Sequence, residues 1–381
     1  MHSIYLDNAA TTPLDPAVQI AMRVAEQKYF GNPSSLHSFG QKSKVALENA
    51  RSLIAEAIGA RRNEIVFTSG GTESNNMALI ATASANRDRG RHIITTPIEH
   101  PAILETCKFL EKIGFSVSYV DMQANGGINL EQLSKLIDSE TIIVSVMLAN
   151  NETGCIFPIQ EISAAIKNKN IYLHTDAVQA LGKVDINVDE LGVDLLSLSA
   201  HKIYGPKGVG LLYVRQGTKI EAFIHGGSQE SRRRGGTENL VGIVGFAEAV
   251  AQLSVKKEEH ARIETLRDLL EDQLKQKIQG VRINGDTVPR LISHTNIYFP
   301  FMSADSLLIN LDLHGIAVSA GSACSSGSTA PSHVLTAMKL PEPRVLNSLR
   351  FSIGRFNTKK DISETVAVIK ELSEKVCGSQ K

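Results

Sequence analysis

Two segments of the chain place an amine and a carboxylate where buried strands are expected to end. Lys202 comes shortly after the apolar stretch 193–198, and Asp176 follows the strand-like run 171–174, with Gln179 close behind. Pyridoxal phosphate needs such a pair, because an amine must bind its aldehyde and a carboxylate must keep its pyridine nitrogen protonated. The alternative for Lys202 is a surface lysine beside a turn, so the assignment depends on the other segments.

A pair of glycines marks a candidate phosphate site. Gly70 and Gly71 lie between a predicted strand end and the helix predicted over 73–85, where backbone N–H groups could approach an anion at a helix N-terminus. The segment fits neither the G-x-x-x-x-G-K-[ST] nor the G-x-G-x-x-G pattern, which favours a phosphate over a nucleotide. An ordinary glycine turn at the start of a helix is the alternative.

Several other polar residues allow both a functional and a structural interpretation. His100 could stack on an aromatic cofactor and move protons, or it could cap a turn. The amides of Asn150 and Asn151 could donate to a ligand oxygen, although Asx residues before a glycine usually form a loop. Arg350, in a strand-like segment, could clamp a carboxylate or form a structural salt bridge. The basic turn 232–237 is by itself best explained as a solvated loop.

The four cysteines, Cys107, Cys155, Cys324 and Cys377, are far apart and form no C-x-x-C pair. This spacing disfavours a zinc site and a disulfide framework, predicts no intrinsic metal, and suits a reducing cytoplasm. The segment 319–329 around Cys324 consists almost entirely of small and hydroxylated residues, which predicts a mobile loop with an accessible thiol. Cys324 is therefore the candidate nucleophile, and the other cysteines are expected to pack or to lie at the surface.

Composition excludes several functional classes. Lys plus Arg equals Asp plus Glu at 40 each, so no net field attracts nucleic acid or an anionic membrane. The first residues have no basic region followed by an apolar one, and no apolar run is long enough to cross a bilayer. We therefore expect no signal peptide, no membrane partner and a cytoplasmic location.

The elements that must position these residues alternate along the first two thirds of the chain. The predicted strands are 64–68, 92–95, 116–120, 141–147, 171–174, 195–199 and 210–215, and the predicted helices include 40–58, 73–85 and 159–167. Such alternation predicts an α/β fold with a mostly parallel sheet flanked by helices. Ligands of such sheets bind beyond the carboxyl ends of the strands, where the candidate residues gather.

The last third of the chain reads as a smaller α+β domain. Apolar residues at three- and four-residue spacing predict a long amphipathic helix over 255–279 that leads into it. Strand-like segments 295–299 and 349–353 and helix-like segments 304–314 and 360–374 follow.

Together these segments resemble the cysteine desulfurases of the NifS/IscS group, in the class-V aminotransferase family of pyridoxal-phosphate enzymes. The resemblance runs in order along nearly the whole chain, through segments 5–13, 31–35, 69–76, 99–101, 150–154, 176–179, 199–202, 232–237 and 322–324. It implies fold type I, with a large cofactor-binding domain over 12–258. The small domain, 1–11 and 259–381, would carry the cysteine loop.

The resemblance implies a role for each residue around the cofactor. Lys202 would bind the aldehyde, Asp176 the pyridine nitrogen and Gln179 the ring hydroxyl. His100 would stack on the ring and move protons. The phosphate would be held by Gly71, Thr72, Ser199 and His201. Thr237 would reach the phosphate of the neighbouring subunit, which implies a homodimer.

For the substrate, the resemblance implies that L-cysteine is bound by Asn151 and by Arg350, the latter at the carboxylate. Cys324, as a thiolate, would take the sulfur as a persulfide and leave L-alanine. Thiolate reactivity depends on a local pKa that the sequence does not supply. A selenocysteine lyase, an aminotransferase and a non-enzymatic binding protein are the alternatives.

The resemblance implies a protein acceptor for the sulfur without naming one. Relatives that dock an iron–sulfur scaffold commonly have a longer C-terminal extension than 376–381, so two acceptors stay open. One is a scaffold for iron–sulfur cluster assembly, and the other is a tRNA-thiolating enzyme. Whether Cys324 also serves as a transient ligand of a partner's cluster is open as well.

Overall fold

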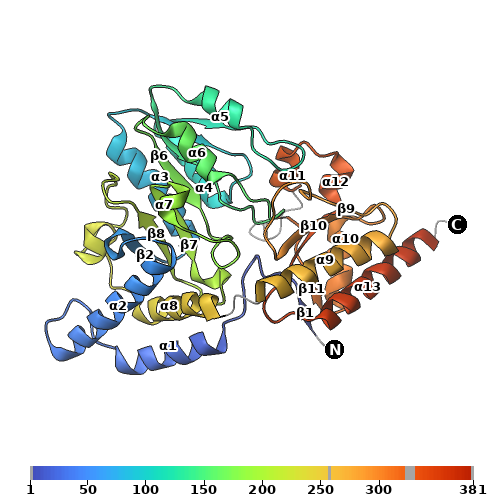
Figure 1. The fold of residues 1–381 in the computed structure, drawn as a ribbon, viewed down its shortest axis with the longest axis horizontal. Helices are drawn as coiled ribbons and strands as arrows, with labels where there is room; N and C mark the ends of the chain where they lie inside the picture. Colours follow the sequence, from blue (N-terminus) through green and yellow to red (C-terminus); the bar gives the residue numbers. More distant parts are fainter. Residues whose placement is uncertain (1–2, 256–258, 322–330, 379–381) are drawn as a thin grey trace.

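A computed structural model describes residues 3–255, 259–321 and 331–378 (Figure 1). Its largest layer is a seven-stranded sheet of order β2-β8-β7-β6-β5-β3-β4. The strands are β2 (Ile65–Thr68), β3 (His92–Thr95), β4 (Ser116–Tyr119), β5 (Thr141–Ser145), β6 (Tyr172–Asp176), β7 (Leu195–Ser199) and β8 (Gly210–Val214). Neighbours from β7 to β4 are parallel, whereas β8 is antiparallel to both β2 and β7. The predicted mostly parallel sheet is confirmed, with an antiparallel edge.

Helices cover both faces of this sheet because its strands are apolar on both sides. On one face α3 (Gly71–Asn86) and α4 (Pro101–Lys112) bury Met77, Leu79 and Ile103 against Ile93 and Leu195. The helices that pack on the other face are α2 (Ser38–Ala57), α5 (Leu130–Leu136), α6 (Ile159–Ile166), α7 (Val188–Leu191) and α8 (Leu240–Val255). In Figure 1, α8 lies between α2 and the outer helix α1 (Pro16–Lys28), and it contacts both.

The remaining elements form a second layer system around an apolar core of their own. Its strands are β1 (Ile4–Tyr5), β9 (Arg282–Ile283), β10 (His294–Tyr298), β11 (Ile316–Ala317) and β12 (Ser348–Ser352), and its longer helices are α9 (Glu259–Lys277), α10 (Ala304–Leu313) and α13 (Lys359–Gly378). The antiparallel sheet β12-β10-β9 is separate from the parallel pair of β1 and β11. Figure 1 shows the N-terminal strand among these C-terminal elements.

The helix predicted over 255–279 corresponds to α9, which begins at Glu259, while Val255 ends the preceding helix α8. Residues 256–258 lie outside the described part of the chain. The division into 12–258 and 1–11 with 259–381 remains a proposal. The separate apolar cores support it, although Val334 and Met338 pack into the core of the large sheet.

The short helical elements connect these layers. They are α11 (His333–Ala337), α12 (Glu342–Leu346), and the 3-10 turns η1 (Arg62–Glu64), η2 (Ala200–Lys202) and η3 (Gln229–Arg232). Among the helices in the described part of the chain, none is long and apolar enough to cross a membrane.

Candidate active site

A pocket of about 350 Å³ opens at the carboxyl ends of the parallel strands. Of the predicted site residues that the structure describes, its lining contains all except Thr237. The lining residues are Ala9, Ala10, Gly71, Thr72, Asn75, His100, Met147, Ala149, Asn151, Asp176, Val178, Gln179, Ser199, His201, Lys202 and Arg350. The expectation that the candidate residues gather at this edge of the sheet is confirmed, while their individual roles remain predictions.

Lys202 enters the pocket from η2, directly after β7. Its Nζ donates to the carbonyl oxygens of Ala9 and Ala10, each at 2.7 Å. These carbonyls come from the chain that follows β1, and Thr12 of the same segment donates both its N–H and its Oγ1 to the His201 carbonyl, which holds the segment against η2. The alternative of a surface lysine beside a turn is therefore wrong.

Asp176 is the last residue of β6 rather than a residue beyond the strand. Its Oδ2 accepts a hydrogen bond from Asn75 Nδ2 at 2.6 Å, and its Oδ1 accepts one from the Val178 N–H at 2.9 Å. Sequence reasoning gave Asn75 no role. The available signal was its position one helical turn after Gly71, which places both residues on the same face of α3.

The turn before α3 is shaped for an anion. Gly70 has φ 154° and ψ −177°, a conformation essentially restricted to glycine, and it begins the helix. A Cβ on Gly71 would stand 2.7 Å from Val178 Cγ2, so a side chain at this position would collide with the pocket lining. The first N–H groups of α3 have no partners within the helix. The Ser199 Oγ is buried and, within the described residues, has no hydrogen-bond partner. These groups fit a phosphate.

His201 and His100 differ in how the structure holds them. Burial, with repulsion from Lys202, lowers the pKa of His201 to about 4, so its ring is neutral at pH 7. The Nδ1 of His100 accepts the Ala102 N–H at 3.0 Å, which makes His100 the N-cap of α4. The capping interpretation of His100 is therefore confirmed; the residue also lines the pocket, where its role toward a cofactor remains a prediction. The cap also places the proton of the neutral ring on Nε2.

Arg350 lies in β12 and is 1% exposed. Its Nη2 donates to Asp7 Oδ1 at 2.6 Å and its Nη1 to the Asn151 carbonyl at 3.0 Å, while its buried Nε has no partner within the described residues. The predicted structural salt bridge is thus present. Asp7 was missed, although it lies in the N-terminal segment of the resemblance.

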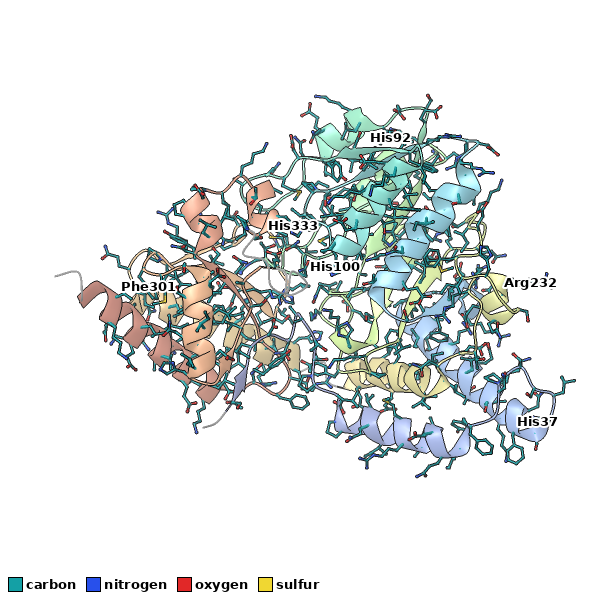
Figure 2. All side chains as sticks on the ribbon, turned by 180° about the vertical axis from the view of Figure 1, so that it is seen from behind. His37, His92, His100, Arg232, Phe301 and His333 are labelled. Carbon is teal, nitrogen blue, oxygen red and sulfur yellow. The ribbon has the colours of Figure 1, made fainter. Side chains whose placement is uncertain are left out.

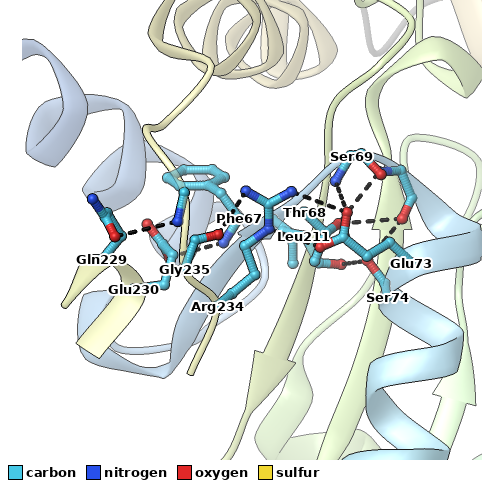
Figure 3. A network of polar contacts seen from close by, with 12 residues as sticks. Phe67, Thr68, Ser69, Glu73, Ser74, Leu211, Gln229, Glu230, Arg234 and Gly235 are labelled. Carbon is cyan, nitrogen blue, oxygen red and sulfur yellow. Dashed lines mark hydrogen bonds and ion pairs between the residues drawn. The ribbon is translucent and has the colours of Figure 1, made fainter. Parts of the chain in front are cut away.

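Thr237 lies outside the pocket, on an exposed loop that Figure 3 shows in part. Arg234 of this loop donates to both carboxylate oxygens of Glu73, at 2.8 and 3.2 Å. Glu73 also accepts the Ser69 N–H at 2.8 Å, so one carboxylate joins the loop to the phosphate turn. The basic turn is therefore not simply a solvated loop.

Cys324 lies outside the described residues, but Ser319 before it contacts Arg350 of the pocket lining, and Ser332 and His333 after it contact residues next to that lining. Ser319 exchanges two backbone hydrogen bonds with Arg350, and Ser332 Oγ donates to Glu152 Oε2 at 2.5 Å. The His333 ring contacts the carbonyl oxygen of Glu99, the residue before His100, at 3.0 Å, and Figure 2 shows the two histidines near each other.

The predictions for two other cysteines can be compared with the structure. Cys107 and Cys155 are both buried and unpaired. Burial raises the pKa of Cys107 to about 12, which makes its thiol unreactive and agrees with a packing role. The side chain of Cys377 lies outside the described part.

Comparison with known proteins places the chain in one class. The model of the family "Aminotransferase class-V" matches residues 4–364. The chain is 50% identical over 375 residues to cysteine desulfurase IscS of Dictyoglomus turgidum, covering 98% of this chain and 95% of that protein. A solved NifS-like protein superposes with a TM-score of 0.91 at 38% identity, covering 97% and 99% of the two chains. A structure described as SspA in complex with cysteine gives 0.81 at 36% identity, covering 93% and 100%.

The chain therefore belongs to the class-V aminotransferase family, and within it to the NifS/IscS group of cysteine desulfurases. This is a pyridoxal-phosphate-dependent family, and the pocket fits that cofactor. It offers an amine at Lys202, a carboxylate at Asp176, and an anion turn at Gly71 beside the Ser199 hydroxyl, which no residue of the described ranges engages.

Proposed function

We propose that this protein converts L-cysteine to L-alanine and holds the released sulfur as a persulfide on Cys324 for delivery to an acceptor. The observation that carries the proposal is the gathering of Lys202, Asp176, His100 and Arg350 around one pocket. The cysteine desulfurases that match along nearly the full chain support it.

When bound, pyridoxal phosphate supplies an aldehyde for the substrate amine and an electron sink for the pair released at Cα. Lys202 would hold the aldehyde, since its Nζ lies at the base of the pocket on the carbonyls of Ala9 and Ala10. Asp176 would hold the ring nitrogen, because Asn75 and the Val178 amide fix its carboxylate. Gly71, Thr72, Ser199 and the neutral His201 would hold the phosphate.

The substrate would be oriented at the opposite wall. Arg350 has five N–H donors, of which Asp7 and the Asn151 carbonyl take two, so donors remain for a substrate carboxylate. Burial strengthens such a charge-assisted bond. His100 would move protons through Nε2, because its Nδ1 is engaged by the helix cap.

The sulfur step requires a thiolate. The Cys324 sulfur would form an S–S bond to the substrate sulfur as the C–S bond breaks, and the electron pair of that bond leaves with the three-carbon product. Protonation of that product gives alanine, so atoms and electrons balance without an external oxidant. The proposal draws support from the described residues before and after this cysteine, since Ser319 pairs with Arg350 and Ser332 donates to Glu152.

The test measures alanine and sulfide from L-cysteine, with a reductant, for the wild type, Lys202→Ala and Cys324→Ala, together with the visible spectrum of bound cofactor. Both variants should lose activity, and Cys324→Ala should keep the spectrum. Turnover that does not need Cys324 would instead support a selenocysteine lyase or an aminotransferase. A colourless, inactive wild type would support a binding protein.

The acceptor is part of the proposal: a scaffold for iron–sulfur cluster assembly or a tRNA-thiolating enzyme. Sulfur-labelled protein prepared from labelled cysteine, then mixed with each candidate, would distinguish them by where the label moves.

We also propose a homodimer, in which Thr237 would reach the phosphate of the neighbouring subunit. Exposed apolar side chains along α1, α2 and the segment that joins them support it. They are here called the α1–α2 patch and are Ile20, Val24, Phe30, Leu36, Phe39 and Val45, with the rings of Phe30 and Phe39 in contact. A patch of this kind marks an interaction surface.

A further inference from the structure

Gln179 is held between two groups that make opposite demands on its side-chain amide. Its Nε2 donates to the Ala9 carbonyl at 2.9 Å, and its Oε1 accepts from Lys183 Nζ at 3.3 Å. The same Nζ donates to the Gln179 backbone carbonyl at 2.9 Å. The Ala9 carbonyl also accepts from Lys202, so the amide group of Gln179 and the amine of Lys202 meet at one oxygen.

Lys183 lies behind the pocket rather than in its wall. It lines a small second cavity of about 40 Å³ that also borders Lys202 and His294. Burial lowers the pKa of Lys183 to about 7, with a further contribution from the charge of Lys202. None of the roles argued above uses this lysine.

The two contacts determine which end of the Gln179 amide faces the pocket. Below that pKa the Lys183 amine is protonated and has only donors, and a backbone carbonyl has only acceptor sites. A rotated amide would set its NH₂ against Lys183 and its oxygen against Ala9, leaving both ends without a hydrogen bond. The pocket side of Gln179 is therefore a donor, which suits an anionic ring oxygen and not a protonated hydroxyl.

We propose that Lys183 is a positioning residue, which acts through Gln179 by orienting its amide so that a hydrogen-bond donor faces the ring oxygen of the cofactor. The proposal rests on the proposed function in requiring pyridoxal phosphate in this pocket. It adds a residue from outside the pocket wall and assigns the direction of one hydrogen bond.

The experiment is a double-mutant cycle with Lys183→Met, Gln179→Ala and the double variant. It measures the dissociation constant for pyridoxal phosphate and the pH midpoint of the visible absorbance of the bound cofactor. Lys183→Met should weaken cofactor binding about five-fold, the loss of one hydrogen bond of ~1 kcal/mol. It should also raise the pH midpoint, because the ring oxygen loses a donor. In the Gln179→Ala background, Lys183→Met should have little further effect.

Two further variants separate orientation from charge and from folding. Lys183→Arg keeps a donor-only cation and should restore both readouts. Lys207→Met removes another cation, one that also acts on His201, but it has no described contact with Gln179 and should change neither readout. If Lys183→Met fails to fold, failure of Lys183→Arg to match the wild type would overturn the proposal.

The outcomes distinguish this inference from the proposed function. A wild type that binds no cofactor would overturn both. The wild type could instead bind the cofactor, with Lys183→Met having the same effect whether or not the Gln179 side chain is present. That outcome would overturn only the inference. That result would assign Lys183 a direct electrostatic effect on Lys202.

Discussion

Glu99 has no exposed surface and lies directly before His100. Its Oε1 accepts from Thr96 Oγ1 at 2.7 Å and from the Met147 N–H at 3.0 Å, while Oε2 has no partner within the described residues. Burial raises its pKa to about 8, despite those two hydrogen bonds. The folded protein therefore holds a proton on Glu99 at neutral pH that the unfolded chain releases.

The sign of this linkage gives a testable pH dependence. A raised pKa stabilises the fold fully below the unfolded value near 4.5, and this contribution is lost as pH rises through about 8. Glu99→Gln resembles the protonated form. Its free energy of unfolding, relative to that of the wild type, should therefore rise by about 2 kcal/mol between pH 6 and pH 8. Urea unfolding at several pH values would measure this. Glu105→Gln, on the exposed side of α4, is the control, and parallel profiles for Glu99→Gln and the wild type would contradict the prediction.

At the residue scale, the side chains with chemical function were the predictable part. Lys202, Asp176 and His100 have side-chain types that few other roles explain in combination, and the structure brings them to one pocket. The carbonyls of Ala9 and Ala10 could not be predicted, because a backbone oxygen has no residue-type signal. Nor could the direction of the Gln179 amide.

Among the elements, η3 is held in an unfavourable conformation. Glu230, Ser231 and Arg232 have φ values of 46°, 57° and 64°, in the left-handed region that costs an L-residue roughly 1 kcal/mol or more. The Glu230 carboxylate stabilises it by pairing with Arg51 at 2.7 and 2.8 Å and by accepting the Phe67 N–H. Such strain persists where surrounding contacts determine the backbone.

Glu230→Gln tests this role. Removing one partner of a buried ion pair leaves the other charge uncompensated, so the variant should lose about 3 kcal/mol of unfolding free energy. Glu48→Gln is the matched control, because Glu48 contacts the same Arg51 from a solvent-exposed position and should cost less than about 0.5 kcal/mol. Denaturant unfolding of both variants measures the difference. Equal losses would mean that Glu230 does not stabilise the turn.

Sequence patterns located the strands of the large sheet well and their directions less well. Strands His92–Thr95 and Leu195–Ser199 match the prediction at both ends, because an apolar run in a buried strand is bounded by polar turns. The same run reads alike in either direction, so the antiparallel insertion of β8 was not predicted. Strands β1 and β11 have two residues each, too few for any periodicity.

At the scale of the whole molecule, some large apolar side chains remain exposed to solvent although many are buried. The cores of the two layer systems bury most large side chains. The α1–α2 patch differs, since Leu36 is 91% exposed and Phe30 is 71% exposed, with the rings of Phe30 and Phe39 5.2 Å apart. No composition argument finds such a patch, because exposure depends on the fold.

The homodimer can be tested at this patch. Phe30→Asp combined with Leu36→Asp would place two charges in an interface that must be desolvated, so the variant should shift towards monomer by sedimentation or light scattering at micromolar concentration. Leu313→Asp is the matched control, because Leu313 at the end of α10 is 72% exposed but outside the patch, and it should leave the mass unchanged. If Thr237 reaches a partner's phosphate, the monomeric variant should also bind pyridoxal phosphate more weakly, and the control should not. A monomeric wild type would exclude both the interface and the role of Thr237 across it.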